Sequence, residues 1–294
     1  MKARVVMAQF ARKALISMVL LVVPALPQAT GLPRARQLYE KTRYEDALAL
    51  LAGVPTENGG VYSLMGECYY MLGDFNKASE ALERAVRLEP NNSEYHLWLG
   101  RAYGRRAETS TFLTAPGHAS KARDHFERAF ALDSSNLEAA GDLFEYYLEA
   151  PSILGGGMSK AVALAEKTKN LDPAEYHYRL ARISDSRAEY KDAEEQFRRA
   201  MDLAPKQVGR VVDLANYLAK RGKYQESEAA YSLAEDIDPN NPKLMFERAK
   251  AYIQSKRNLD RARELLVRYL NSPLSPNDPS RREAEQLLKQ ARTG

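Results

Sequence analysis

The sequence predicts an all-α fold, a solenoid built from repeated helix–turn–helix units. Three windows, 62–90, 177–205 and 211–239, share one spaced pattern of apolar, small and aromatic residues. The last two windows end at prolines that are 34 residues apart, which is one repeat period. Within each window apolar residues recur one helical turn apart, so each helix is expected to bury a single face.

The first helix of each unit carries a small residue where it must approach its partner helix closely. Glycine or alanine at such a point removes the side chain that would keep two backbones apart. The second helices carry an alanine followed four residues later, on the same face, by a large apolar residue. The small first-helix residues are Gly66, Gly100, Ala181 and Ala215. The second-helix pairs are Ala78 with Leu82, Ala122 with Phe126, Ala193 with Phe197, and Ala262 with Leu266.

Seven units and a terminal helix follow from this pattern. A linker, NSPLSPNDPS, precedes an amphipathic helix expected over 281–292, which should cover the exposed end of the stack. The expected organisation is a signal peptide at 1–31, a repeat array at 32–271, and a linker with a capping helix at 272–294. The units are expected at about 33–55, 59–92, 93–136, 137–173, 174–207, 208–241 and 242–271.

The repeated pattern resembles the tetratricopeptide repeat family, over nearly all of residues 33–271. The unit of that family is a helix–turn–helix of about 34 residues, with a signature of Leu-Gly, Tyr, Ala, an aromatic residue, Ala and Pro. The resemblance implies a right-handed superhelical solenoid whose first helices line a concave groove, and a binding scaffold. In the first window the signature falls on Met65, Gly66, Tyr69, Ala78, Leu82, Ala85 and Pro90.

The N-terminus has the pattern of an export signal. Residues 1–31 contain four basic residues and no acid, and residues 14–26 are apolar. About 13 apolar residues suit the core of a signal peptide, whereas a membrane span needs about 20. Small residues predict cleavage before Leu32 or before Leu26, and the alternative is an uncleaved membrane anchor. We therefore expect an exported bacterial protein, periplasmic or secreted, with no stable membrane insertion after cleavage.

The charge and the cysteine content exclude nucleic-acid binding and an intramolecular disulfide. Beyond residue 31 the chain carries 39 basic and 39 acidic residues, so it has no basic surplus for binding nucleic acid. The single cysteine, Cys68, cannot form an intramolecular disulfide. We expect it to be a small buried apolar residue.

Motifs for catalysis, cofactors or metals are missing from the sequence. The four histidines show no metal-ligand spacing, and no Gly-x-Ser-x-Gly elbow occurs. The run Gly155–Gly157 lies between helical patterns, whereas a phosphate loop follows a strand and precedes Lys-Ser/Thr. We expect no catalytic residue, cofactor or metal, and therefore no enzyme.

Two adjacent units carry insertions at the same place. The spacing from the first-helix tyrosine to the second-helix alanine is 9 residues in the second unit, 19 in the third and 14 in the fourth. The extra residues predict enlarged turns at 104–121 and 151–157. Because all such turns share one edge of a stack, we expect these segments to form one lip beside the groove. The alternatives are that the lip contacts a partner, or that its apolar residues pack against one another and only stiffen the array.

The predicted function is a scaffold that binds a protein or peptide partner through the groove and the lip. Aromatic and arginine side chains are typical of such surfaces. The alternatives are an accessory factor for assembly or export of an envelope polymer, and a small-ligand or enzymatic site in the lip. The predicted partner-binding residues are Tyr70, Arg101, Arg105, Arg106, Phe112, Glu145, Ile153, Leu154, Tyr178, Arg182 and Asn216.

Overall fold

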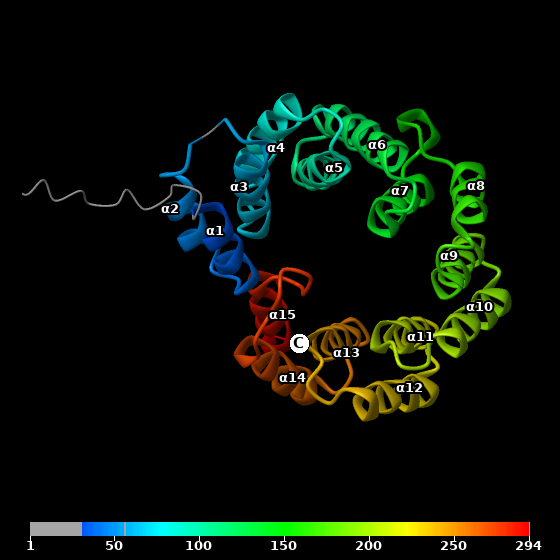
Figure 1. Cartoon of the computed structure of the whole chain (residues 1–294). Helices are drawn as coiled ribbons and strands as arrows, with labels where there is room; N and C mark the ends of the chain where they lie inside the picture. The colour runs from blue at the N-terminus through cyan, green and yellow to red at the C-terminus, as the bar shows by residue number, and fades with distance from the viewer. Residues whose placement is uncertain (1–30, 56, 294) are drawn as a thin grey trace, which may run out of the picture.

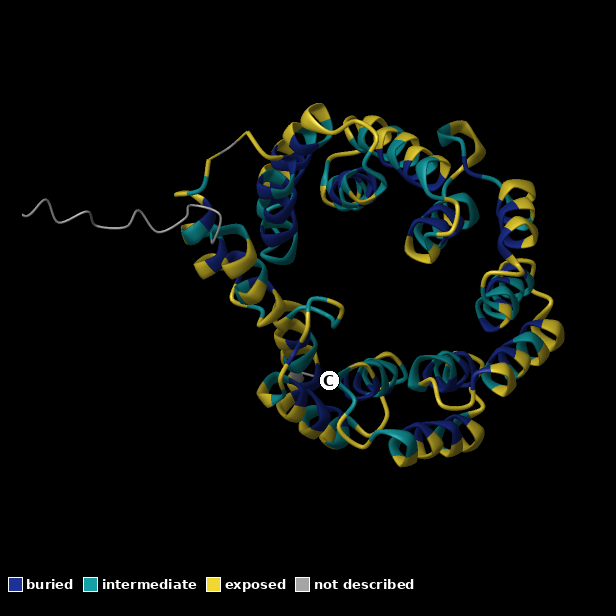
Figure 2. Ribbon diagram, in the orientation of Figure 1, coloured by how far each residue is buried: buried dark blue, intermediate teal, exposed yellow. Residues whose placement is uncertain are grey.

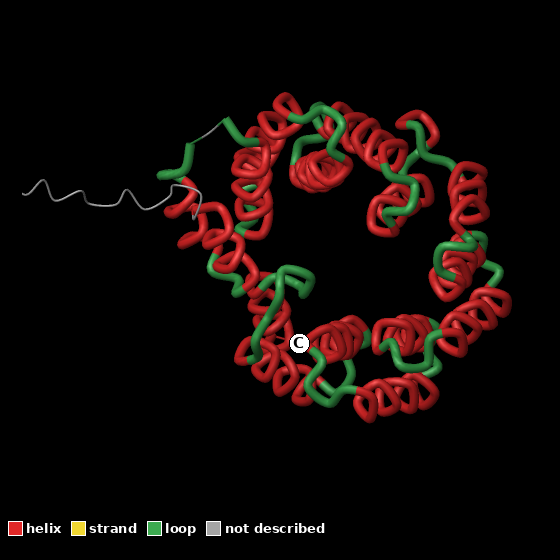
Figure 3. Tube along the Cα trace, viewed as in Figure 1, coloured by secondary structure: helices red, strands yellow, loops and turns green. Residues whose placement is uncertain are grey.

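The computed structural model describes residues 31–55 and 57–293. Within these residues it contains fifteen α-helices, the 3₁₀ helix η2 and no strand (Figure 3), so the all-α prediction is confirmed. The predicted signal peptide lies outside the described residues, except for Gly31, which begins the first helix.

The helices form seven antiparallel pairs followed by a single C-terminal helix. The first four pairs are α1 (Gly31–Glu40) with α2 (Tyr44–Leu51), α3 (Gly59–Met71) with α4 (Phe75–Leu88), α5 (Ser93–Thr109) with α6 (Ala115–Leu132), and α7 (Leu137–Glu149) with α8 (Met158–Thr168). The 3₁₀ helix η2 (Ser152–Leu154) lies between α7 and α8. The remaining helices are α9 (Pro173–Ser186), α10 (Tyr190–Leu203), α11 (Val208–Lys220), α12 (Tyr224–Ile237), α13 (Pro242–Gln254), α14 (Leu259–Asn271) and α15 (Arg281–Thr293).

The pairs stack into a curved solenoid. Figure 1 shows the first helices of the later units, α5, α7, α9, α11 and α13, on the inside of the curve and their partners on the outside. Buried residues lie between the two layers, while exposed residues face mainly outwards (Figure 2). The inner helices therefore line the concave face.

Small residues allow the close helix approach that the repeat register predicted. A Cβ added to Gly66 would lie 2.4 Å from Cγ of Leu82, and one added to Gly100 would lie 2.6 Å from the ring of Phe126. Real Cβ atoms do not approach other atoms so closely, so both positions require glycine in this backbone. Cys68 is fully buried between the first two units, as predicted.

The regular turns within units share one left-handed backbone position. Gly73 (φ 78°) and Gly222 (φ 74°) occupy it in the second and sixth units. Thr42 (54°), Ala188 (60°) and Lys256 (53°) adopt the same conformation without being glycine. A side chain at positive φ costs roughly 1–2 kcal/mol, so three turns are held in strained geometry by the packing of the helices around them.

The insertion in the third unit lengthens helices instead of enlarging a turn. Residues 104–109 continue α5 and residues 115–121 begin α6, which leaves a turn of only 110–114. These helices have 17 and 18 residues, against 13 and 14 in the second unit, so each gains about one turn. The predicted turn at 104–121 is therefore wrong in form. Arginine, alanine and glutamate favour helix, and the proline near the start of α6 is tolerated there.

The C-terminal helix caps the array at its last unit. Ala284 is fully buried against the cluster that holds Leu266 and Tyr269 of α14. Ser280 and Glu283 bond reciprocally at the helix start, as in a capping box. The helix predicted over 281–292 is thus present as α15, and it covers the apolar end of the stack.

Candidate functional site

The concave face is hollowed between α9, α11 and α13. A cleft of about 530 Å³ lies there. Three of the predicted partner-binding residues, Tyr178, Arg182 and Asn216, line this cleft. Lys220 and Glu247 line it as well, so the cleft presents an aromatic ring between charges of both signs. The groove prediction placed these residues on one surface, and they do lie together.

Charged residues of the groove pair across neighbouring units. In the third unit, Arg101 Nε lies 2.5 Å from Asp142 of α7, and its Nη2 lies 2.9 Å from Glu138. The Arg101 guanidinium also lies over the ring of Trp98, 4.9 Å from its centre. Arg101 was predicted to bind a partner, and in the structure it joins the third unit to the fourth.

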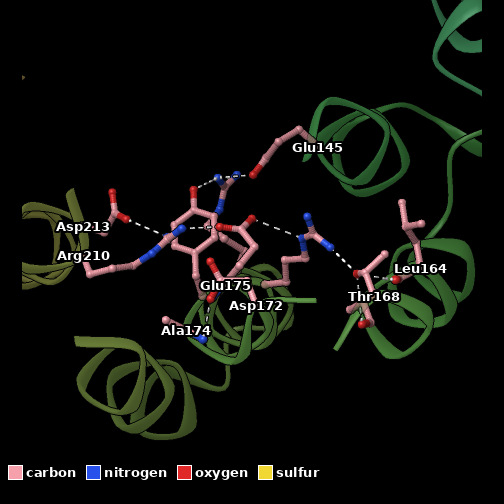
Figure 4. Close-up of polar contacts among 12 residues, drawn as sticks. Glu145, Leu164, Thr168, Asp172, Ala174, Glu175, Arg210 and Asp213 are labelled. Carbon is pink, nitrogen blue, oxygen red and sulfur yellow. Dashed lines mark hydrogen bonds and ion pairs between the residues drawn. The ribbon is translucent and has the colours of Figure 1, made fainter. Parts of the chain in front are cut away.

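The fourth and fifth units are joined in the same way (Figure 4). Arg182 Nη1 lies 2.8 Å from Glu145, and its Nη2 lies 3.2 Å from Glu149. The hydroxyl of Tyr178 accepts a further bond from Arg182 at 3.2 Å. Burial raises the pKa of Glu145 to about 7, because the carboxylate loses its water in the groove wall. The positive charge of Arg182 opposes this rise.

A second chain of polar contacts continues from the fifth unit to the sixth (Figure 4). Arg210 of α11 is ion-paired with Glu175 of α9 and lies 3.0 Å from Asp213. Glu175 also accepts from Nε of Arg179, and Nη1 of Arg179 donates to the Thr168 hydroxyl. Arg179 is only 1% exposed, and its Nη2 has no hydrogen-bond partner among the described residues. A buried arginine at this position had not been predicted.

The sixth unit is tied to both of its neighbours. Lys220 lies 2.7 Å from Asp185 of the fifth unit. Asn216 donates to Glu247 of the seventh unit at 3.3 Å and accepts from the Tyr231 hydroxyl at 2.5 Å. Asn216 is therefore held in one orientation by contacts on two sides.

These pairs form what we call the groove ladder. Its members are separated by nearly one repeat period, 37 residues for Arg101–Glu138 and for Glu145–Arg182, and 35 residues for Asp185–Lys220. Opposite charges one period apart on first helices were the sequence signal that could have revealed it. Arg101, Arg182 and Arg210 are each paired with two acids, so the ladder neutralises these arginines and carries more carboxylates than cations.

Aromatic side chains line the groove at the second and third units. Tyr70 makes edge contacts with Phe75 and Trp98, each with ring centres 5.5 Å apart. Arg105 lies over the Phe75 ring, 5.1 Å from its centre, and pairs with Glu108 at 2.6 Å. Tyr70 and Arg105 therefore belong to one aromatic patch at the end of α5.

The glycine-rich turn of the fourth unit is held by hydrogen bonds on several sides. The Leu154 carbonyl accepts from Arg123 of α6 at 3.1 Å and from the Tyr146 hydroxyl at 2.8 Å. Lys160 donates to the Gly155 carbonyl at 2.8 Å. The Gly157 amide donates to the carbonyl of Tyr147 at 2.8 Å. The turn is thus fixed to α6, α7 and α8 together.

Each glycine of this turn has a separate structural reason. Gly155 (φ 85°) and Gly157 (φ 144°) adopt backbone angles that other residues rarely reach. A Cβ added to Gly156 would lie 1.9 Å from the carbonyl oxygen of Ala150, where no side chain fits. The run is therefore a required turn, in agreement with the exclusion of a phosphate loop.

The tips of the lip present large apolar side chains to solvent. Phe112 is 82% exposed, Leu113 is 77% exposed and Ile153 is 92% exposed. Leu154 is partly buried beside α6. The alternative that these four residues bury one another is wrong, because three of them contact little. Arg123 of α6, two residues beyond the first insert, donates to the second insert at the Leu154 carbonyl.

Arg106 points away from the groove. Its Nη1 donates to the Ser79 hydroxyl of α4 at 2.9 Å, and its guanidinium lies over the Tyr103 ring, 5.4 Å from the centre. Arg106 Nε is buried and has no partner among the described residues. The predicted set thus divides into groove residues, lip tips, and this arginine between α4 and α5.

A row of rings that the sequence did not reveal crosses the third unit. The Nδ1 atoms of His96 and His125 lie 2.9 Å apart, and Tyr103 stacks between His118 and His125 with both ring centres 5.9 Å away. Burial, together with the nearby His96, lowers the pKa of His125 to about 4. The spacing of seven residues between His118 and His125, and between His96 and Tyr103, was the available signal.

Over residues 31–55 and 57–293, no three histidine, cysteine, aspartate or glutamate side chains gather as a metal site would require. In the same part of the chain no helix is both long and apolar enough to cross a bilayer.

Comparison with known proteins identifies the repeats. Models of the tetratricopeptide repeat match residues 38–101, 174–207 and 212–279, together more than half of the chain. The chain belongs to the tetratricopeptide repeat family. Proteins of this family in general bind other proteins, so a general role in protein interaction follows from the assignment.

Relatives match only part of their own length. A TPR repeat-containing protein of Methanocaldococcus jannaschii is 26% identical over 180 residues, 58% of this chain and 30% of that protein. A tetratricopeptide repeat protein 30 homolog of Aedes aegypti is 33% identical over 88 residues, 27% of this chain and 13% of that protein. The chain therefore spans less than a third of the length of these curated relatives.

Solved structures share the solenoid. A tetratricopeptide repeat protein of Parabacteroides merdae superposes with a TM-score of 0.58 at 14% identity, covering 90% of this chain and 98% of that one. A thermophilic TPR protein of Thermus thermophilus gives a TM-score of 0.52 at 22% identity, covering 65% and 98%. At these identities the likeness shows the fold alone.

Proposed function

We propose that this chain is an exported, non-enzymatic scaffold that binds a protein or peptide through the concave groove and the lip beside it. The observation that carries the proposal is the exposure of Phe112, Leu113 and Ile153. Large apolar side chains that a monomer keeps in water mark a contact surface when they lie together on one edge. A turn fixed by four hydrogen bonds holds Ile153 there, so little conformational entropy would be lost on binding.

The groove supports the same proposal through its chemistry. Tyr70 and Tyr178 offer aromatic faces, while Asn216 and the groove ladder offer donors and acceptors in fixed positions. Because carboxylates outnumber cations along the ladder, the groove suits polar or basic peptide segments better than acidic ones.

Export is the second part of the proposal, and it rests on the basic and apolar N-terminus. Processing before Leu32 or Leu26 would release a periplasmic or secreted repeat array. Intact mass or N-terminal sequencing of the protein from its native host tests this. Retention of Met1 on a protein found in the cytoplasm would contradict it.

The binding proposal is tested by capture from the native envelope fraction with a matched control. The double variant F112S/I153S removes the most exposed apolar side chain of each insert, while V267S removes an apolar residue, 46% exposed, from α14. We expect capture of the partner to fall at least about tenfold for the tip variant, since each apolar anchor contributes roughly 1.5–3 kcal/mol. V267S should capture as wild type does, and equal capture by all three proteins would refute a role of the tips.

A further inference from the structure

The two ends of the solenoid meet. Figure 1 shows α15 close beside α1, so the array curves through almost a full circle. A Cβ added to Gly73, in the turn between α3 and α4, would lie 3.0 Å from Nη1 of Arg282 in α15. Burial raises the pKa of Tyr44 at the start of α2, and the charges of Arg281 and Asp278 also act on it. The first two units and the C-terminal segment are therefore in contact.

A cleft of about 870 Å³ lies along this contact. Its walls come from 70–76 of the second unit, from 105–110 at the end of α5, and from 276–286 of the C-terminal segment. Among the described residues, no hydrogen bond or ion pair joins 275–286 to the first three units. We call this contact the junction. Unlike the pairs of consecutive units that the groove ladder links, it is made by packing alone.

The C-terminal side of the junction is a preformed surface. The Tyr269 hydroxyl donates to the Pro279 carbonyl, and Asp278 accepts from Ser275 at 2.8 Å within the same turn. Glu283 accepts from Ser280 at 3.1 Å. Asp278 and Glu283 are thus both engaged within the C-terminal segment itself.

We propose that the junction is the gate of the groove: closed, it makes the concave face the inside of a ring, and it opens by flexing of the array to admit a partner from the side. The junction is weaker than the contacts between consecutive units. Contacts between consecutive units carry charge-assisted bonds and shared cores, whereas the junction carries neither, so a small distortion spread over the units separates the ends first.

The gate also indicates which partners can enter the groove, an inference that rests on the proposed function. A groove that closes into a ring can surround an extended segment of polypeptide. Lateral opening would let it take a segment that lies between two folded domains, which could not be threaded from an end.

Closure is tested by distance measurement in the full-length protein. Spin labels on the variant N76C/Q286C report across the cleft, since both residues are exposed and line it. The native Cys68 is fully buried, and burial raises its pKa to about 12, so it stays unlabelled. We expect a short, dominant distance, whereas a broad distribution of long distances would overturn closure.

Gating is tested by charge reversal and reagent size. R282E places a carboxylate at Gly73 beside Asp74, while R292E makes the same change at the far end of α15. With Q254C as a reporter in the groove, a 5-kDa PEG-maleimide should react up to about fivefold faster in R282E than in R292E, the size of effect that a surface charge contact supplies. N-ethylmaleimide should react equally with both.

Equal PEG-maleimide rates in the two variants would overturn the gate. Longer label distances in R282E with no change in these rates would also overturn it, because the ends would then separate without changing access. Neither experiment uses a partner, so its failure would leave the proposed function standing. Loss of tip-dependent capture would in turn leave the gate standing.

Discussion

Acidification should weaken the third unit, because His125 is neutral in the folded protein. Burial and the neighbouring His96 lower its pKa from 6.5 to about 4. Above pH 6.5 the ring is neutral in both states. Between pH 6.5 and 4 the unfolded chain binds a proton that the folded chain excludes, so the free energy of unfolding falls as the pH falls. At 1.36 kcal/mol per pKa unit, and allowing for the partial exposure of the ring, the loss is about 2–3 kcal/mol.

The variant His125→Phe removes this titrating group together with its contact to His96. It keeps an aromatic ring against Tyr103 but does not titrate, while every other ionisable group remains. Urea unfolding between pH 7 and pH 4 should show wild type losing about 2–3 kcal/mol more than the variant. The ring proton of His125, followed by NMR, should titrate near pH 4 in the folded protein. A titration midpoint near pH 6.5, or equal losses of unfolding free energy in both proteins, would show that burial does not keep His125 neutral.

Five further substitutions, at four positions, test the packing of the array. Ala188→Gly should stabilise the fold by about 0.5–1 kcal/mol, because it relieves a positive φ, and Gly222→Ala should destabilise it by a similar amount. Melting temperatures that change in the same direction for both variants would contradict the shared turn geometry. Arg179→Ala should lower the free energy of unfolding by about 3–5 kcal/mol, because it leaves buried polar groups unpaired. Arg179→Met should lower it much less. Equal losses for the two variants in denaturant titrations would argue against a buried ion pair. Gly156→Ala should destabilise the fold by about 1–3 kcal/mol and speed hydrogen exchange in the turn at 151–157, since the added Cβ would clash with the carbonyl of Ala150. Unchanged exchange rates would show that the turn is not tightly held.

The repeat register could be predicted because it depends on local spacing. Small residues at Gly66 and Gly100 and large partners at Leu82 and Phe126 specify how two consecutive helices approach, and the structure confirms these contacts. The capping helix was predictable for a similar reason, since its apolar stripe needed a covered face. The glycine run also predicted the turn at 151–157, because positive φ angles have few alternative residues.

The groove residues were predicted on the correct face, but their interactions were not. Arg101 and Arg182 were expected to be available to a partner, whereas both are paired with acids of the neighbouring unit. A helix between two neighbours has contacts on three sides, and a single helical projection distinguishes only the inner side from the outer side.

The form of the lip and the meeting of the ends lay beyond the sequence. Residues 104–121 have a length that suits either a loop or two longer helices, and only packing against α4 and α7 decides between them. The junction depends on a small angle between units summed over the whole array. No single residue encodes that sum, so contact between Gly73 and Arg282 could not be derived from spacing.

The most direct test of the scaffold assignment is the affinity of the captured partner, once purified, for the lip and groove variants. Titration calorimetry or surface plasmon resonance would compare wild type with F112S/I153S, with the groove variant Y178A, and with V267S as the control. We predict at least about tenfold weaker binding for the tip variant, clearly weaker binding for Y178A and wild-type affinity for the control. Wild-type affinity in both test variants, with intact helical content, would contradict the claim that the groove and the lip bind the partner.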